Sequence, residues 1–345
     1  MKKTALALVL AASAVLGAAP SPATPSPAAP SPSAPSQAAP SAAPPSDPPR
    51  AELRALVGDV RQATAYRYRA TDSQGRSMDA AKVIQTAPGS YLATYHTMRS
   101  DGRFHAALAS SSDLMNWTFV EDFGPGTSQP SIVQLSDGGY LMAWEQDPAN
   151  HLALRYFPSR ADLFAGTFTR QYDAKRSLSS CAEGTPNIYS VRLAPDIDHS
   201  VIELGGHYFS NCDVDRQMRA VLTDFSSWSA VKQNEFDNAL LYWGVRGNIG
   251  DRDAVQFRGF PYALIEGQYT KNDFGSWRTF LYDYQTGNAD PVTVTTHGGS
   301  TASANPSVTA LTTPSGQPAV LVGLFIPSEG AAPGEAGELL YYRTY

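Results

Sequence analysis

A short strand pattern recurs five times along the chain, and this repeat constrains the fold more than any other feature. Each copy has a small-residue or proline-containing lead-in followed by a run of apolar residues. The five copies are Met78–Ile84, Gln129–Val133, Thr185–Tyr189, Arg252–Phe257 and Asn305–Thr309. Their central residues Val83, Ile132, Ile188, Val255 and Val308 are 49, 56, 67 and 53 residues apart. A period near 50 residues, with several strands per unit, is typical of propeller blades.

Each lead-in is followed by a turn and a more hydrophobic strand, such as SYLATYHT after the first and AVLVGLFI after the last. The chain is therefore predicted to form an all-β, five-bladed β-propeller. Only 37 residues follow Val308, so we expect Tyr66–Thr71 to supply the outer strand of the last blade and close the ring. Two stacked β-sandwiches are the alternative architecture.

The first 50 residues differ in composition from the rest. Residues 1–19 combine Lys2 and Lys3 with the apolar run Ala5–Ala19, which indicates a secretory signal peptide and is too short for a convincing membrane span. Residues 20–49 hold 12 of the 26 prolines, so residues 20–50 are predicted to be an Ala/Pro/Ser-rich linker. The propeller domain is then residues 51–345, and it opens with a short helix at Ala51–Gln62. We expect an exported protein, outside the cell or in its envelope, with no membrane span in the mature chain.

The charge and the cysteine content of the chain exclude some classes of partner and some kinds of chemistry. Residues 51–345 carry 23 basic and 31 acidic side chains, with no basic run longer than two, so nucleic acid is not an expected partner. The chain has two cysteines, Cys181 and Cys212, and an exported protein with one pair usually joins them in a disulfide. Two buried free thiols are the alternative. No CxxC or HExxH spacing occurs, so zinc chemistry finds no support.

A turn motif in these units resembles one in a known group of enzymes. Ser112–Trp117 (SDLMNW) lies between the third and fourth strands of the first unit, and Thr223–Trp228 (TDFSSW) takes the same place in the third. With five irregular four-strand units, the chain resembles the five-bladed β-propeller glycoside hydrolases of families 43, 62 and 32, most closely family 43. The resemblance implies a secreted enzyme of polysaccharide degradation.

Propeller topology sorts the polar residues by face. The inner strands begin on one face, and the loops joining second to third strands return to it, so both sets converge on one funnel. The inner-strand starts supply Asp79, Gln129, Glu183, Asn187, Asp251, Arg252, Asp253 and Asn305. The second-to-third loops supply His96, Arg99, Asp101, Glu145, Asp147, Asn211, Asp213 and Glu266.

This funnel is rich in carboxylates, which suits glycoside hydrolysis by one protonated acid and one ionised base. By resemblance, Asp79 is the base, Glu183 in the EGTP segment is the acid, and Asp253 or Asp251 is the third carboxylate. Two departures weaken the match: Ala80 replaces the family's proline after the base, and Glu183 opens the third unit although the family's acid usually lies on the fourth blade. The structural alternatives are that Asp79 only caps the entry to its strand, and that Asp251 and Asp253 form an ion-pair cluster with Arg252.

The remaining expectations concern substrate, cofactor and assembly. Residues expected to bind substrate are His96, Gln129, Glu145, Asn187, Asn211, Arg252 and Asn305. The predicted activity is hydrolysis of arabinofuranosyl or xylosyl linkages in a polysaccharide or oligosaccharide, with inversion, by a monomer. No cofactor or catalytic metal is expected, although a structural Ca²⁺ could lie at the propeller centre. A non-catalytic, lectin-like carbohydrate-binding propeller is the alternative, and a glycan phosphorylase or transferase is a third hypothesis.

Overall fold

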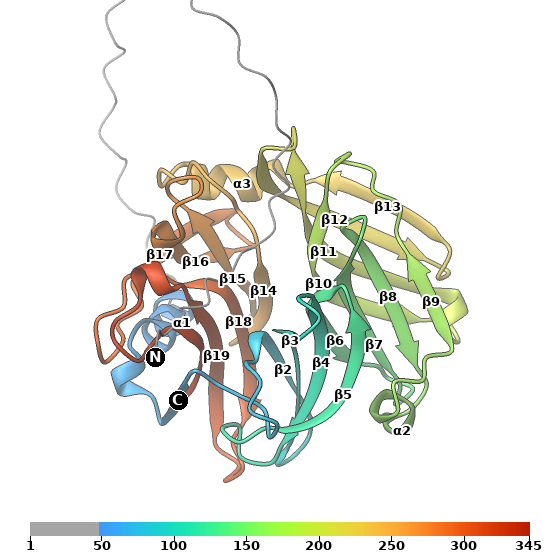
Figure 1. Ribbon diagram of the computed structural model, residues 1–345, viewed down its shortest axis with the longest axis horizontal. Coiled ribbons are helices and arrows are strands. Elements are labelled where there is room, and N and C mark those ends of the chain that lie inside the picture. The colour runs from blue at the N-terminus through green and yellow to red at the C-terminus, as the bar shows by residue number, and fades with distance from the viewer. Residues whose placement is uncertain (1–47) are drawn as a thin grey trace, which may run out of the picture. The chain divides into compact units, whose positions relative to one another are not determined.

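The computed structural model describes residues 48–345, and within them five four-stranded antiparallel sheets form a ring (Figure 1). The first sheet consists of β2 (Asp79–Ala87), β3 (Ser90–Met98), β4 (Phe104–Ser111) and β5 (Thr118–Pro125). The second consists of β6 (Thr127–Gln134), β7 (Tyr140–Gln146), β8 (His151–Phe157) and β9 (Arg170–Asp173). The third consists of β10 (Glu183–Leu193), β11 (Ser200–Ser210), β12 (Val214–Thr223) and β13 (Ser227–Lys232). The predicted five-bladed propeller is confirmed.

The last two blades complete the ring. The fourth consists of β14 (Arg252–Phe257), β15 (Phe260–Gln268), β16 (Trp277–Asp283) and β17 (Asn288–Val292). The fifth consists of β18 (Ala304–Thr312), β19 (Pro318–Ile326), β20 (Gly337–Thr344) and β1 (Ala65–Tyr68). β1 pairs antiparallel with β20, with Ala65 opposite Tyr342 and Tyr68 opposite Leu339. The segment just after the first helix therefore closes the ring, as the shortened last unit predicts.

Hydrophobic packing lies between blades, which distinguishes a propeller from stacked sandwiches. Five separate clusters of buried apolar residues occur, and four of them are shared by two neighbouring blades. The fifth packs α3 (Asn234–Leu241) and the segment after it against the fourth blade. The cluster between the first and second blades, for example, joins Leu92 and Leu108 to Met142 and Trp144. Because every blade contributes to at least one shared cluster, no sheet buries its faces without its neighbours.

Helix α1 (Pro48–Gly58) begins three residues earlier than predicted and ends four residues sooner. Two prolines fit its first turn, where backbone N–H groups have no partner within the helix. Leu53, Leu56 and Val57 bury its apolar side against the fourth and fifth blades, and Figure 1 shows it beside β19. The last three residues assigned to the linker therefore belong to α1, whereas the predicted signal peptide lies outside the described residues.

Apart from α1, the helical segments of the described region are short and lie in the connections before and between strands. They are α2 (Arg160–Phe164), α3 (Asn234–Leu241) and four 3₁₀ turns at Val60–Gln62, Ile197–His199, Phe274–Ser276 and Ser328–Gly330. Across residues 48–345, no helix is long and apolar enough to span a membrane.

The predicted disulfide between Cys181 and Cys212 is present, with Cα atoms 5.7 Å apart. Cys181 precedes β10 and Cys212 lies in the turn between β11 and β12, so the bond ties two loops of the third blade together. We expect the Cys181→Ser/Cys212→Ser variant to lose about 3–4 kcal/mol of unfolding free energy, because the unfolded chain regains the freedom of a 31-residue loop. Urea unfolding of the variant and of the oxidised wild type measures this loss, and reduced wild type serves as the matched control. Identical midpoints for variant and oxidised wild type would contradict it.

Candidate active site

Four of the five inner strands begin with the same backbone irregularity. Ala80, Gln129, Thr185 and Asn305 have positive φ angles of 54°, 51°, 46° and 44°. Each lies at a register shift between the first and second strand of its blade. Such a bulge leaves one residue outside the pairing of its own sheet. The N–H group of that residue is therefore free to bond elsewhere.

In each case this N–H group donates to a side chain of the preceding blade. Gln129 N donates to His96 Nδ1 at 3.0 Å, and Asn305 N donates to Glu266 Oε2 at 2.6 Å. The other two acceptors are Glu338, which receives Ala80 N at 3.2 Å, and Glu145, which receives the N–H of Thr185. We call His96, Glu145, Glu266 and Glu338 the clamp residues. They hold neighbouring blades together at the end of the ring where the inner strands begin.

Burial at this end of the ring raises the pKa values of the three clamp glutamates and lowers the pKa of His96. Burial first, and then the nearby charge of Asp251, raises the pKa of Glu266 to about 8. Burial raises the pKa of Glu145 as well, and that of Glu338 lies well above its usual value because of burial and the charge of Asp79. Burial lowers the pKa of His96 to about 3, so this imidazole is neutral and its Nδ1 accepts a hydrogen bond.

Asp79, the predicted base, lies at the start of β2 with a relative exposure of 5%. Its carboxylate accepts one side-chain hydrogen bond, from the Ser77 hydroxyl at 2.8 Å. Burial raises the pKa of Asp79 to about 6, and the hydrogen bond from Ser77 opposes this shift. Glu338 lies near enough for its pKa to respond to the Asp79 charge. Of these two carboxyl groups, Asp79 therefore ionises first.

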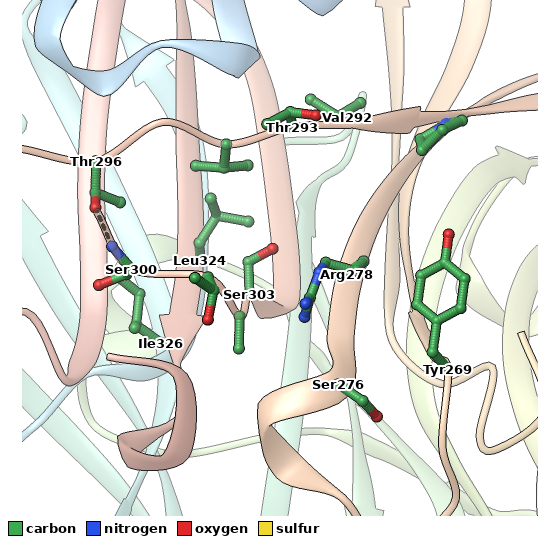
Figure 2. A pocket seen from close by; sticks show the side chains of 14 residues that line it. Tyr269, Ser276, Arg278, Val292, Thr293, Thr296, Ser300, Ser303, Leu324 and Ile326 are labelled. Carbon is green, nitrogen blue, oxygen red and sulfur yellow. Dashed lines mark hydrogen bonds between the residues drawn. The ribbon is translucent and has the colours of Figure 1, made fainter. Parts of the chain in front are cut away.

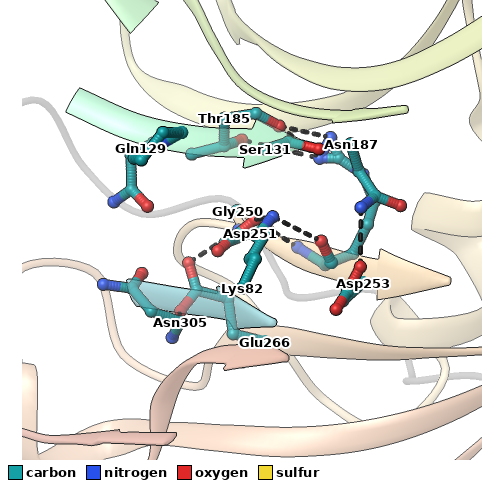
Figure 3. Close-up of polar contacts among 12 residues, drawn as sticks. Lys82, Gln129, Ser131, Thr185, Asn187, Gly250, Asp251, Asp253, Glu266 and Asn305 are labelled. Atoms are coloured by element: carbon teal, nitrogen blue, oxygen red, sulfur yellow. Dashed lines mark hydrogen bonds and ion pairs between the residues drawn. The ribbon is translucent and has the colours of Figure 1, made fainter. Parts of the chain in front are cut away.

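A buried ion pair lies between the inner strands of the first and fourth blades (Figure 3). Lys82 Nζ is 2.9 Å from Asp251 Oδ1 and donates to the Arg252 carbonyl oxygen at 3.0 Å. The Arg252 guanidinium donates to the Thr185 carbonyl oxygen of the third blade, and within residues 48–345 it forms no ion pair with Asp251 or Asp253. The ion-pair partner of Asp251 is therefore Lys82 and not Arg252, and the sequence analysis missed this lysine.

Asp253 and Asn187 lie on the other side of this ion pair from Gln129 and Asn305 (Figure 3). Asn187 Nδ2 donates to Asp253 Oδ1 at 2.7 Å, and Val308 N donates to Asp253 Oδ2 at 3.0 Å. Burial raises the pKa of Asp253 to about 6. Both residues line a central channel of about 300 Å³ bounded by all five inner strands. Asp253 therefore links the third, fourth and fifth blades, and both its oxygens are occupied.

Glu183, the predicted acid, is 1% exposed at the start of β10. Its Oε1 accepts three backbone N–H groups, from Ser177, Leu178 and Ser179, at 2.7, 2.6 and 3.1 Å. This carboxylate thus anchors the loop that precedes the disulfide. The glycine after it has a separate cause, because a Cβ at Gly184 would overlap Glu145 Oε2.

Three other predicted binding residues occupy different environments. Gln129 and Asn305 are partly exposed at the starts of β6 and β18, and the Gln129 side-chain oxygen has no hydrogen-bond partner within residues 48–345. Asn211 is exposed in the turn beside Cys212. Gln129 and Asn305 can therefore offer amide groups to a ligand at the funnel end, together with the half-buried Glu145.

In the part of the chain that the structure describes, no three His, Cys, Asp or Glu side chains group in a way that could hold a metal ion. The Lys82 ammonium lies among the inner strands that line the central channel. A structural Ca²⁺ at the propeller centre therefore finds no ligand cluster in the described residues.

The folded protein is expected to be most stable at about pH 4–5. Glu266, Asp79 and Asp253 have pKa values raised to about 8, 6 and 6 from 4.5, 3.8 and 3.8, so they bind more protons folded than unfolded. Stability therefore falls as pH rises from about 4 to 8. Glu335, whose pKa is lowered from 4.5 to about 2, makes stability fall below pH 4.5. Thermal unfolding between pH 3 and 9 measures this, and a maximum at pH 8 would contradict it.

Comparison with known proteins finds likeness in structure only. No family model matches the sequence, and no curated protein does. The structure of a BT0996–RGII complex is 11% identical with a TM-score of 0.54, and the match covers 86% of this protein and 95% of that one. A structure titled "Glycoside hydrolase" is 11% identical with a TM-score of 0.53, covering 82% and 92%. The protein shares their fold.

An N-acetylgalactosamine deacetylase from F. plautii, in complex with blood group B trisaccharide, is similar to the same degree. It is 12% identical with a TM-score of 0.52, and the match covers 84% of this protein and 94% of that one. The resemblance to five-bladed glycoside hydrolases is thus confirmed at the level of the fold. Because a deacetylase shares this fold, activity has to be argued from the site.

Proposed function

We propose that the protein is an exported, monomeric glycoside hydrolase that cleaves glycosidic bonds in a polysaccharide or oligosaccharide. One observation carries this proposal. Two buried carboxyl groups lie at the end of the ring where the inner strands begin: Asp79 opens β2, and Glu266, near the end of β15, accepts the N–H groups of Asp251 and Asn305. Their pKa values are raised to about 6 and about 8. Between these values one is ionised and the other protonated, which is the state that acid–base hydrolysis of a glycoside needs. The disulfide fits an oxidising compartment outside the cell.

In the proposed reaction Asp79 is the base and Glu266 is the acid. Asp79 takes a proton from a water molecule, whose oxygen forms a bond to the anomeric carbon. Glu266 donates its proton to the glycosidic oxygen as the bond between that oxygen and the anomeric carbon breaks. The products are two sugars with free hydroxyl groups, and the anomeric configuration inverts.

The third carboxylate in this proposal is Asp251. Its N–H donates to Glu266 Oε1 at 2.8 Å, and its charge helps to raise the pKa of Glu266. The acid role predicted for Glu183 and the third-carboxylate role predicted for Asp253 pass to Glu266 and Asp251. We prefer Glu266 because Glu183 Oε1 accepts three backbone N–H groups of the loop before β10, whereas each Glu266 oxygen accepts one. We prefer Asp251 because it contacts Glu266 directly, whereas both oxygens of Asp253 are bonded within the central channel.

The proposed substrate carries arabinofuranosyl or xylosyl units, as the sequence resemblance implies. Gln129, Asn305 and Glu145 would bind sugar hydroxyl groups, since amides donate to and accept from hydroxyl groups and carboxylates accept from them. The five inner-strand starts present chemically different groups, whereas a lectin-like propeller with equivalent sites would repeat them. This difference favours one central site, and several equivalent binding sites per molecule on a glycan array would favour the lectin alternative.

The test is sugar release from arabinan, arabinoxylan and xylo-oligosaccharides, measured as new reducing ends. We expect activity on at least one of them, and its loss in Glu266→Gln. Repeating the assay with and without phosphate separates hydrolysis from phosphorolysis, because only a phosphorylase yields sugar phosphate. Absence of release from the whole panel by the purified wild type would contradict the proposal.

A further inference from the structure

A second cavity, of about 550 Å³, lies between the fourth and fifth blades (Figure 2). Its walls come from the loop between β15 and β16, the connection from β17 to β18, and the end of β19. These segments belong to the same face of the ring as the inner-strand starts, because second-to-third loops and blade-to-blade connections all reach that face. Lining residues Thr293 and Thr301 are exposed whereas Leu324 and Ile326 are buried, so the cavity runs from the surface inward.

One cation, Arg278, lines this cavity and has an unused binding edge. Its Nη1 donates to the carbonyl oxygens of Gly275 and Trp277, both at 2.8 Å, which fixes the guanidinium in place. Within residues 48–345 no carboxylate pairs with Arg278, and no hydrogen bond is formed by Nε or Nη2. These two nitrogens form the side of the guanidinium that binds a carboxylate through two parallel hydrogen bonds.

The rim opposite Arg278 is built as a rigid loop. Glu335 accepts the Thr296 hydroxyl at 2.6 Å, the Gly298 N–H at 2.7 Å and the Ser300 hydroxyl at 2.5 Å. Burial alone would raise the pKa of Glu335, but these hydrogen bonds outweigh it and lower the pKa to about 2. Glu335 is therefore saturated with donors, and it keeps Thr296 and Ser300 in the cavity wall.

The remaining wall of the cavity is apolar and suits a ligand that has apolar surface. Val292, Leu324 and Ile326 line it, and Figure 2 shows Arg278 between Ser303 and Tyr269 among the lining side chains. A sugar ring has apolar C–H faces and polar edges. A sugar that also carries a carboxylate would place its ring C–H groups on this wall and its charge on the free edge of Arg278.

We propose that this cavity is an accessory subsite for a uronic acid residue of the glycan, with Arg278 binding its carboxylate through Nε and Nη2. The subsite rests on the proposed function only for the identity of the polymer, because the binding itself needs no catalysis. It would favour acidic, uronate-substituted glycans over neutral ones on the face where hydrolysis takes place.

The test is calorimetric binding to Glu266→Gln, the variant expected not to cleave its ligand. The probes are a glucuronic-acid-substituted xylo-oligosaccharide, its unsubstituted parent and free glucuronate. We expect the substituted oligosaccharide to bind about 10–100-fold more tightly than the parent, as a charge-assisted bidentate contact allows. Adding Arg278→Leu should remove this difference, and Arg278→Lys should restore only part of it, since lysine offers charge without the fork.

Arg219→Leu is the matched control, because Arg219 pairs with Glu203 on the third blade and lies outside the cavity lining. It should leave the preference for the substituted oligosaccharide unchanged. Equal affinity for the substituted and parent oligosaccharides, or a preference that survives Arg278→Leu, would overturn the subsite. Free glucuronate binding as tightly as the substituted oligosaccharide would overturn the glycan assignment. Sugar release by the wild type is measured separately, so failure of the subsite and failure of the hydrolase proposal are distinguishable.

Discussion

The Asp79→Asn variant is expected to lose kcat by about 10²–10⁴-fold, the usual contribution of a positioned general base. Asparagine keeps the shape of the side chain and its contact with Ser77, but it cannot take a proton from the attacking water. The measurement is kcat and KM for sugar release from the best polysaccharide of the panel. KM should change little, because the substituted group acts on water and not on the sugar.

Glu145→Gln is the matched control for this experiment. Glu145 is a half-buried clamp residue near the end of β7, and we propose that it binds sugar hydroxyl groups. Its replacement is expected to act mainly on KM, while kcat stays within about tenfold of the wild type. If Asp79→Asn kept the wild-type kcat, Asp79 would not be the base. If Glu145→Gln lost more of its kcat than Asp79→Asn, the catalytic carboxylate would lie on the second blade.

Lys82→Met is expected to cost about 3–5 kcal/mol of unfolding free energy, the range for removing one partner of a buried ion pair. Methionine keeps most of the apolar stem but leaves the buried Asp251 carboxylate without its ammonium partner. The same change removes the hydrogen bond to the Arg252 carbonyl oxygen. Urea unfolding at pH 7 measures the loss.

The double variant Lys82→Met/Asp251→Leu tells a broken ion pair from a packing defect. Without the carboxylate no buried charge is left unpaired, so the double variant should unfold at higher urea than Lys82→Met alone. A double variant less stable than either single one would contradict the account of this pair. Asp251→Leu alone should also be destabilised, because it leaves the Lys82 ammonium buried without its carboxylate.

The fold was predictable because its signal repeats. Val83, Ile132, Ile188, Val255 and Val308 all lie in inner strands, and the shortened last unit correctly required an N-terminal closing strand. The disulfide between Cys181 and Cys212 followed from the presence of one cysteine pair in a chain predicted to be exported. Element boundaries were less accurate, as the start of α1 shows, because Pro48 and Pro49 continue the proline-rich composition of the linker although proline also fits a first helical turn.

The site was predictable as a set of residues and not as a set of contacts. Asp79, Glu145 and Glu266 follow from strand order, but their hydrogen bonds depend on bulges at residues such as Asn305, which no spacing indicates. Glu338 was missed because it begins a third strand and reaches the funnel end across the ring closure. Lys82 was missed because its partner is 169 residues away.

The contacts of Glu183 could not be predicted from the sequence either. The resemblance of the EGTP segment to the family's acid motif predicts that Glu183 is the acid. In the structure its oxygen accepts the N–H groups of Ser177 and Leu178, and the glycine makes room for Glu145. Both causes are tertiary contacts, so local sequence could not reveal them.

The central claim, that Asp79 and Glu266 divide the work of base and acid, is tested most directly by kcat/KM against pH. Activity should rise through about pH 6 as Asp79 ionises and fall through about pH 8 as Glu266 loses its proton. With an aryl glycoside whose leaving group needs no protonation, Glu266→Gln should remain active and lose the fall at high pH. A fall near pH 8 that persists in Glu266→Gln on this substrate would contradict the account.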